Sequence, residues 1–137
     1  MKQLPATALL ILAAACTAAS LQAQSHEARA DVPFSFAVGS KQLPAGHYTF
    51  LTGPSDTIVT RNTDNGVVIL SRKETAFHPV GYLNVLVFNK YGDQYFLREI
   101  RCPSIAMNVE IPQSKMERQI RVHTASLGPD QTLLALK

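Results

Sequence analysis

The segment NKYGDQYFLREI, residues 89–100, gathers the side chains that most resemble a chemical site. Tyr91 and Tyr95 flank Asp93, and Arg98 follows on the same stretch. An acid–base pair needs two groups that converge on one point, whereas adjacent strand residues point to opposite faces. The spacing therefore predicts no catalytic pair. If this segment lines a binding site, we expect Tyr91, Asp93, Tyr95 and Arg98 to form its rim.

A hairpin explains the same segment without any chemistry. Gly92-Asp93 lies between two strand-like stretches, residues 82–90 and 94–101. Glycine first in a two-residue turn suits type II′ geometry, which joins twisted antiparallel strands. The turn predicts three cross-strand pairs, namely Lys90 with Tyr95, Phe88 with Leu97, and Val85 with Ile100. On this register one face would carry Leu83, Val85, Val87, Phe96, Ile100 and Cys102, with Arg98 as its charged misfit.

Motifs for metal binding and nucleophilic catalysis are missing from the sequence. His26, His47, His78 and His123 show no ligand-type spacing among themselves. No nucleophile elbow, phosphate-binding glycine loop or dinucleotide fingerprint occurs. We therefore expect no catalytic residues, no metal and no cofactor. His47 is the one outlying candidate for a binding site.

The charge of the chain is small and scattered. Lysine and arginine total 13 and aspartate and glutamate total 10, for a net charge of +3. A nucleic-acid-binding protein needs a basic patch that follows the phosphate backbone. No run of the sequence supplies one, so nucleic acid is not an expected partner.

The N-terminus predicts export. Lys2 precedes a short apolar run over residues 9–15, and small residues follow it, as in a secretory signal peptide. The run is too short to span a bilayer. Cleavage is expected after Ser20 or Ala23, which makes residues 1–23 the signal peptide. The mature chain would then be periplasmic or secreted, with no transmembrane span.

The two cysteines each allow two interpretations. Cys16 could carry a lipid anchor, although Ala13 stands where a lipoprotein signal has a leucine-like residue. Cys102 would be the only thiol left after cleavage, and is either a buried apolar residue or a link between two chains. It follows Ile100 at strand spacing, which favours burial and leaves an oligomer as the alternative.

The rest of the chain predicts one β-rich domain. Residues 24–31 are polar and suggest a flexible lead-in, and residues 32–137 alternate short strand-like stretches with turn motifs. Residues 32–38 alternate with period two, and Asn65-Gly66 is the strongest hairpin motif. These features predict an all-β, mainly antiparallel fold of about six to eight strands, in a small barrel or a sandwich.

One short helix is expected at about residues 115–123. Ser114 and Glu117 have the spacing of a capping box, in which the serine accepts from the backbone and the glutamate reaches back. Met116 and Ile120 would face inward. A last strand would follow over residues 131–136.

Three stretches resemble a group of small exported proteins of soil bacteria: VPFSFAVGSKQLPAGHYTF, FNKYGDQYFLREI and IPQSKMER. The resemblance runs from Val32 to about Arg118. It departs at Ile111, where the group usually has leucine, and at Cys102. It implies an exported, β-rich protein in which LPAGHY and YGDQYF form structural corners. It implies no catalytic or binding residues.

Three classes of function fit these features. The first is a non-catalytic binding or interaction module of the cell envelope, which holds a small amphipathic ligand or another envelope protein. The second is a structural envelope component without a small ligand. The third and least favoured is a hydrolase with a dispersed site, which would need a buried histidine near a carboxylate and a hydroxyl.

Overall fold

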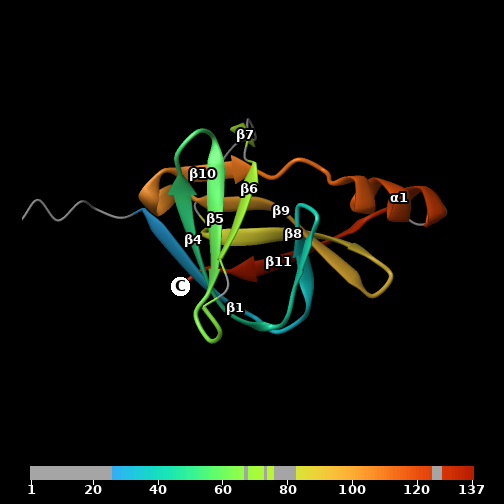
Figure 1. Cartoon of the computed structure of the whole chain (residues 1–137), viewed down its shortest axis with the longest axis horizontal. Coiled ribbons are helices and arrows are strands. Elements are labelled where there is room, and N and C mark those ends of the chain that lie inside the picture. Colours follow the sequence, from blue (N-terminus) through green and yellow to red (C-terminus); the bar gives the residue numbers. More distant parts are fainter. Residues whose placement is uncertain (1–25, 67, 73, 76–82, 125–127) are drawn as a thin grey trace, which may run out of the picture.

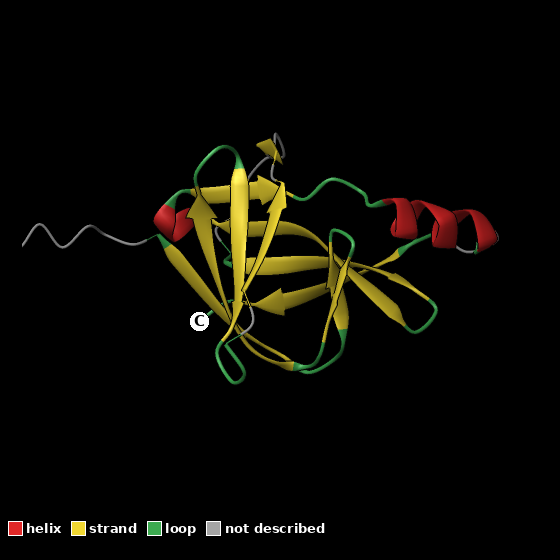
Figure 2. Cartoon of the chain, in the orientation of Figure 1, coloured by secondary structure: helices red, strands yellow, loops and turns green. Residues whose placement is uncertain are grey.

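The computed structural model describes residues 26–66, 68–72, 74–75, 83–124 and 128–137. The expected signal peptide, its two cleavage points, Cys16 and His78 lie outside these residues. Within them, strands dominate and one α-helix is present (Figures 1 and 2). None of the described helices is long and apolar enough to cross a membrane.

The first sheet has the strand order β1-β4-β5-β6, with antiparallel neighbours throughout. In Figure 1 its strands β4, β5 and β6 lie in front of the second sheet and run across it. The bounds are β1 Glu27–Val32, β4 Gly46–Gly53, β5 Thr57–Asn62 and β6 Val68–Arg72.

The second sheet has the order β11-β8-β9-β10-β7, and the short β2 lies parallel to the start of β9 and also pairs with β3. A single 3-10 turn, Pro103–Ile105, joins β9 to β10. The bounds are β2 Phe36–Val38, β3 Lys41–Leu43, β7 Glu74–Thr75, β8 Val85–Tyr91, β9 Gln94–Cys102, β10 Met107–Glu110 and β11 Asp130–Ala135.

The all-β prediction is confirmed. Eleven strands are described, and eight of them are four residues or longer, within the expected range. The described strands form two packed sheets that do not close into a barrel. The expected lead-in over residues 24–31 is wrong from Glu27 onward, because β1 pairs with β4 along its whole length and buries Ala28 and Ala30.

The main core lies between the two sheets. Phe36 packs edge-on against Tyr48 and Phe88, with ring centroids 4.9 and 5.4 Å away. A smaller apolar cluster, Ala37, Tyr91 and Phe96, forms separately and packs against the α-helix. Residues 32–38 supply both clusters, since Phe36 lies in the main core and Ala37 in the smaller one.

The β8–β9 hairpin has the predicted turn. Gly92 has a φ of +60°, which glycine adopts without strain. Tyr91 and Gln94 flank the two turn residues as a pair. The expected pairs of Lys90 with Tyr95 and of Phe88 with Leu97 are confirmed.

Beyond those pairs the predicted register is wrong by one residue, because β9 contains a bulge. Phe88 pairs with Leu97 but Val87 pairs with Glu99, so Arg98 is the extra residue. A bulge redirects the side chain of the inserted residue. Ile100 therefore pairs with Leu86 and Val85 with Arg101. The face toward the main core carries Leu86, Phe88, Leu97, Ile100 and Cys102, whereas Leu83 is exposed.

The predicted helix is confirmed as α1, Lys115–His123. The Ser114 side chain accepts a hydrogen bond from the Glu117 backbone N–H at 3.1 Å, as the capping spacing requires. Met116 and Ile120 pack against the smaller cluster, as expected. In Figure 1, α1 lies at one end of the molecule, beyond the second sheet.

Candidate functional site

The structure does not bring the four expected rim residues together. Asp93 is exposed at the tip of the hairpin. Tyr95 stacks on Phe34, with ring centroids 3.9 Å apart, against the main core. Tyr91 lies in the smaller cluster and Arg98 points toward α1. Residues 89–100 therefore form a hairpin whose polar side chains contact different parts of the fold.

Glu117 is the centre of a buried polar network under α1. Its side chain is only 2% exposed. Its Oε1 accepts hydrogen bonds from the Tyr91 hydroxyl and from Asn89 Nδ2, each at 3.3 Å. Its Oε2 lies 3.9 Å from Arg98 Nη1. The carboxylate thus turns inward to the sheet. The capping-box spacing had predicted that it would reach back to the start of the helix instead.

Arg98 extends this network to the chain after β10. Its Nη2 donates to Glu110 Oε1 at 2.8 Å, and its Nη1 donates to the carbonyl oxygen of Ile111. Burial raises the pKa of Tyr91, and the nearby charge of Glu117 raises it further. We call Asn89, Tyr91, Arg98, Glu110 and Glu117 the helix clamp. Their polar groups bind one another, so the clamp holds α1 in place and leaves little capacity for a ligand.

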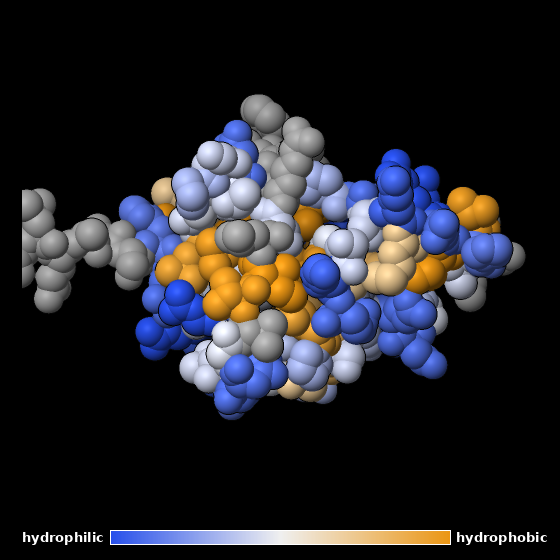
Figure 3. Space-filling model, in the orientation of Figure 1, coloured by the Kyte–Doolittle hydropathy of each residue, from blue (hydrophilic) through white to orange (hydrophobic). Residues whose placement is uncertain are grey.

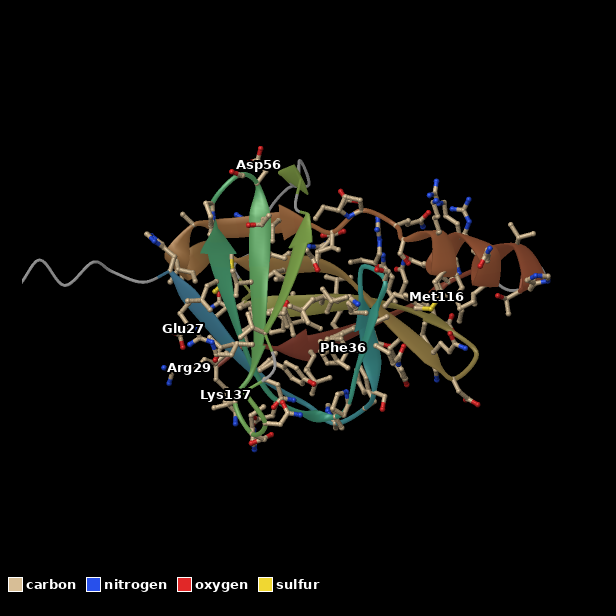
Figure 4. The ribbon with its side chains drawn as sticks, in the orientation of Figure 1. Glu27, Arg29, Phe36, Asp56, Met116 and Lys137 are labelled. Carbon is tan, nitrogen blue, oxygen red and sulfur yellow. The ribbon has the colours of Figure 1, made fainter. Side chains whose placement is uncertain are left out.

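A second group of polar residues lines an open hollow of about 950 Å³ on the outer face of the first sheet. The alternation of β1 explains its origin, because Ala28, Ala30 and Val32 face the core. The charged residues between them face outward. In Figure 4, Glu27, Arg29 and Lys137 lie near one another at the β1 side of the molecule. The outer hollow is lined by Glu27, Arg29, Ala30, Asp31, His47, Tyr48, Thr49, Arg61, Thr63 and Lys137.

Asp31 binds the side chains of Lys137 and His47 in this hollow. Lys137 Nζ and His47 Nδ1 each hydrogen-bond a different oxygen of its carboxylate. These bonds, that from Lys137 above all, lower the pKa of Asp31. The hydrogen bond to Asp31 in turn raises the pKa of His47. A raised pKa favours the charged form of the ring, and the bond to Asp31 occupies Nδ1, so this histidine is not arranged as a general base.

The hydrolase hypothesis gains no support at this histidine. The side chain of His47 is 63% exposed, and its ring is hydrogen-bonded to Asp31. No hydroxyl group bonds to the ring among the described residues. The required combination of burial, carboxylate and hydroxyl is therefore not met in this part of the chain.

Arg61 is the cation of the hollow that has no acidic partner among the described residues. Arg29 Nε binds Glu27 Oε1 at 2.7 Å, and Lys137 is held by Asp31. Arg61 lies on β5 beside Thr49 of β4 and is exposed. Its guanidinium can therefore donate to a ligand without first breaking an ion pair.

The LPAGHY corner positions His47 at the edge of the hollow. Tyr48 closes the corner by donating its hydroxyl hydrogen to the Pro44 carbonyl at 2.5 Å. The His47 N–H donates to Asp64 Oδ2 at 3.1 Å, and its carbonyl accepts from the Thr63 N–H at 2.9 Å. A Cβ on Gly46 would lie 2.9 Å from Asp64 Oδ2 and would push this carboxylate away from the His47 N–H. These contacts hold the corner, and with it His47, in place.

The remaining candidate residues are one cysteine and two histidines, and none of them lines the hollow. Cys102 is 5% exposed in the main core, with its Sγ 3.4 Å from Ser104 Oγ, which agrees with the buried interpretation. His26 and His123 are exposed. Over the described ranges, no three metal-ligating side chains lie together.

The outer hollow is harder to predict than the clamp because its lining comes from β1, β4, β5 and the last residue of the chain. Only the alternating charges of residues 27–31 could have indicated it. No protein-family model, curated protein or solved structure matches the chain.

Proposed function

We propose that this chain is an exported, non-catalytic binding module of the cell envelope, and that its outer hollow recognises an anionic group. One observation carries the proposal. Arg61 lies in a hollow with an excess of positive charge and has no acidic partner among the described residues. A guanidinium offers paired donors that match an oxyanion.

The side-chain charges of the hollow support an anionic ligand. The side chains of Arg29, Arg61 and Lys137 oppose those of Glu27 and Asp31, which leaves an excess of one positive side-chain charge. Protonated His47 would add a second. Because the hollow is open to water, each charged contact contributes modestly and the anionic group alone would bind weakly.

Export is supported by the N-terminal sequence. Lys2, the apolar run over residues 9–15 and the small residues after it form a signal-peptide pattern. The lack of a nucleophile or metal motif in the sequence supports a binding role over a catalytic one.

An NMR titration with sodium acetate tests the anion site. The labelled protein, in the form to which cells process it, is titrated at constant ionic strength with chloride as the replaced anion. Amide shifts should cluster at Arg29, Thr49 and Arg61. Arg61→Gln should weaken acetate binding about threefold, since an exposed charged contact contributes roughly 0.2–1 kcal/mol.

Arg118→Gln is the matched control, because Arg118 is an exposed arginine on α1, outside the hollow. It should leave acetate binding unchanged. Equal binding by the wild type and Arg61→Gln, or shifts centred on α1, would overturn the proposal.

A structural envelope component is the second candidate, favoured by exposed leucines near β8 and β11. Leu83 precedes β8 and Leu133 lies on β11, and both are exposed. A self-associating envelope protein could bury them in an interface. Sedimentation at increasing protein concentration tests this candidate: a stable oligomer that Leu133→Asp dissociates supports it, and a monomer throughout rejects it.

A further inference from the structure

An apolar strip lies beside the outer hollow on the same face of the first sheet. It consists of Leu51, Val59 and Val68. Leu51 of β4 pairs directly with Val59 of β5, so their side chains share one face. Figure 3 shows an apolar area over β4, β5 and β6 on the side of the molecule that faces the viewer.

Arg61 connects this strip to the hollow. Val68 is its direct cross-strand partner. Val59 is two residues before it on β5 and therefore points to the same face. Directly opposed residues have Cβ atoms roughly 5 Å apart. A ligand head group on Arg61 would therefore place its first carbon atoms against Val59 and Val68.

The strip is accessible to a ligand. Val68 is 50% exposed, and Leu51 and Val59 are each partly exposed. Val122 and Leu133 are also exposed apolar residues, but they lie on α1 and β11, outside the hollow. Of these exposed side chains, Val68 is the one paired with a cation of the hollow.

We infer that the ligand of this face is a single-chain alkyl carboxylate, with its carboxylate on Arg61 and its chain along Leu51, Val59 and Val68. The inference rests on the proposed anion site and adds the apolar part of the ligand. The excess of positive side-chain charge in the hollow favours a carboxylate head group. The neighbouring strip provides apolar surface for a chain.

A series of straight-chain carboxylates, from acetate through butyrate to octanoate, tests the inference. A fully buried methylene strengthens binding about fourfold. Because the strip is open on one side, we expect about twofold per methylene in this series. Octanoate should therefore bind at least tenfold more tightly than butyrate to the wild-type protein.

The double variant Val59→Thr, Val68→Thr should remove most of this dependence on chain length. Threonine keeps the branched shape that strands favour and replaces a methyl group by a hydroxyl. Acetate, which has only one methyl group beyond its carboxylate, should bind the double variant within about twofold of the wild type. Val122→Thr, an exposed valine on α1, is the control and should change neither measurement.

The outcomes separate the two proposals. If acetate binds but octanoate binds no more tightly than butyrate, the inferred alkyl chain is wrong and the anion site remains. If the affinity still rises from butyrate to octanoate in the double variant, the inferred chain position is also wrong, because the chain would then bind elsewhere. Failure of acetate to bind would overturn the anion site itself. Binding to vesicles of anionic lipid but not to soluble octanoate would replace the inferred ligand by a membrane surface.

Discussion

Removing the carboxylate of Glu117 should destabilise the protein strongly. In Glu117→Ala, the Tyr91 hydroxyl and Asn89 Nδ2 lose the oxygen that accepts from both of them. Each buried donor left without a partner costs about 1–3 kcal/mol. Arg98 keeps its bond to Glu110, so its lost interaction at 3.9 Å adds less. We expect a loss of about 3–5 kcal/mol, in the range for breaking a buried ion pair.

A second substitution separates the hydrogen bonds from the charge. Glu117→Gln keeps a side-chain oxygen that can accept from Tyr91 and Asn89, and loses only the charge facing Arg98. We expect it to lower the free energy of unfolding by about 1–2 kcal/mol. The backbone N–H of residue 117 still donates to Ser114 in both variants, so the helix cap is unchanged.

Urea unfolding followed by tyrosine fluorescence and circular dichroism measures these differences, since the chain has no tryptophan. Arg118→Gln, an exposed position on α1, is the control and should change stability by less than about 0.5 kcal/mol. Hydrogen exchange in α1 should be accelerated in Glu117→Ala. If Glu117→Ala were no less stable than the control, the helix clamp would not hold α1 as described.

Two further predictions concern the corner and the hollow. Gly46→Ala should destabilise the protein by roughly 0.5–1.5 kcal/mol, because its Cβ, 2.9 Å from Asp64 Oδ2, would displace the carboxylate that accepts from the His47 N–H. Gly128→Ala, whose Cβ would meet no described atom within 4 Å, should be nearly neutral in the same urea assay. The raised pKa of His47 means that its bond to Asp31 stabilises the fold fully below the unfolded value of 6.5 and is lost as pH rises through the folded pKa. The wild type should therefore exceed His47→Gln in stability by more at pH 5.5 than at pH 8.5, and a constant difference across that range would contradict this sign.

The elements with strong local patterns could be predicted from the sequence. Gly92-Asp93 determined the hairpin, and the spacing of Ser114 and Glu117 determined where the helix begins. Both depend on residues that are close in the chain. Whether the strands form a closed barrel or two sheets depends on pairings between strands that are distant in the chain. The sequence therefore left both architectures open.

The bulge at Arg98 shows why the register of the second sheet could not be predicted. A two-residue turn predicts the first pairs correctly, and a single inserted residue reverses the faces beyond it. The one indication of the bulge in the sequence was Arg98, a charged residue that the predicted register placed on an apolar face. Its partners Glu110 and Glu117 come later in the chain, so the burial of Glu117 depended on a contact that local spacing does not specify.

The outer hollow was the least predictable feature. The polar composition of residues 24–31 predicts a lead-in, although β1 supplies Arg29 and Asp31 to the hollow. His47 is only an outlying candidate in the sequence, and no motif marks Arg61. These residues become neighbours only when β1, β4 and β5 pair.

The most direct test of the proposed site is a set of intermolecular nuclear Overhauser effects between butyrate and the labelled protein. The proposed site predicts contacts from the butyrate methylene next to the carboxylate to the methyl groups of Thr49 and Val59, and their loss in Arg61→Gln. Contacts confined to α1 or β11, or contacts that persist unchanged in Arg61→Gln, would contradict the claim that the outer hollow is an anion-binding site.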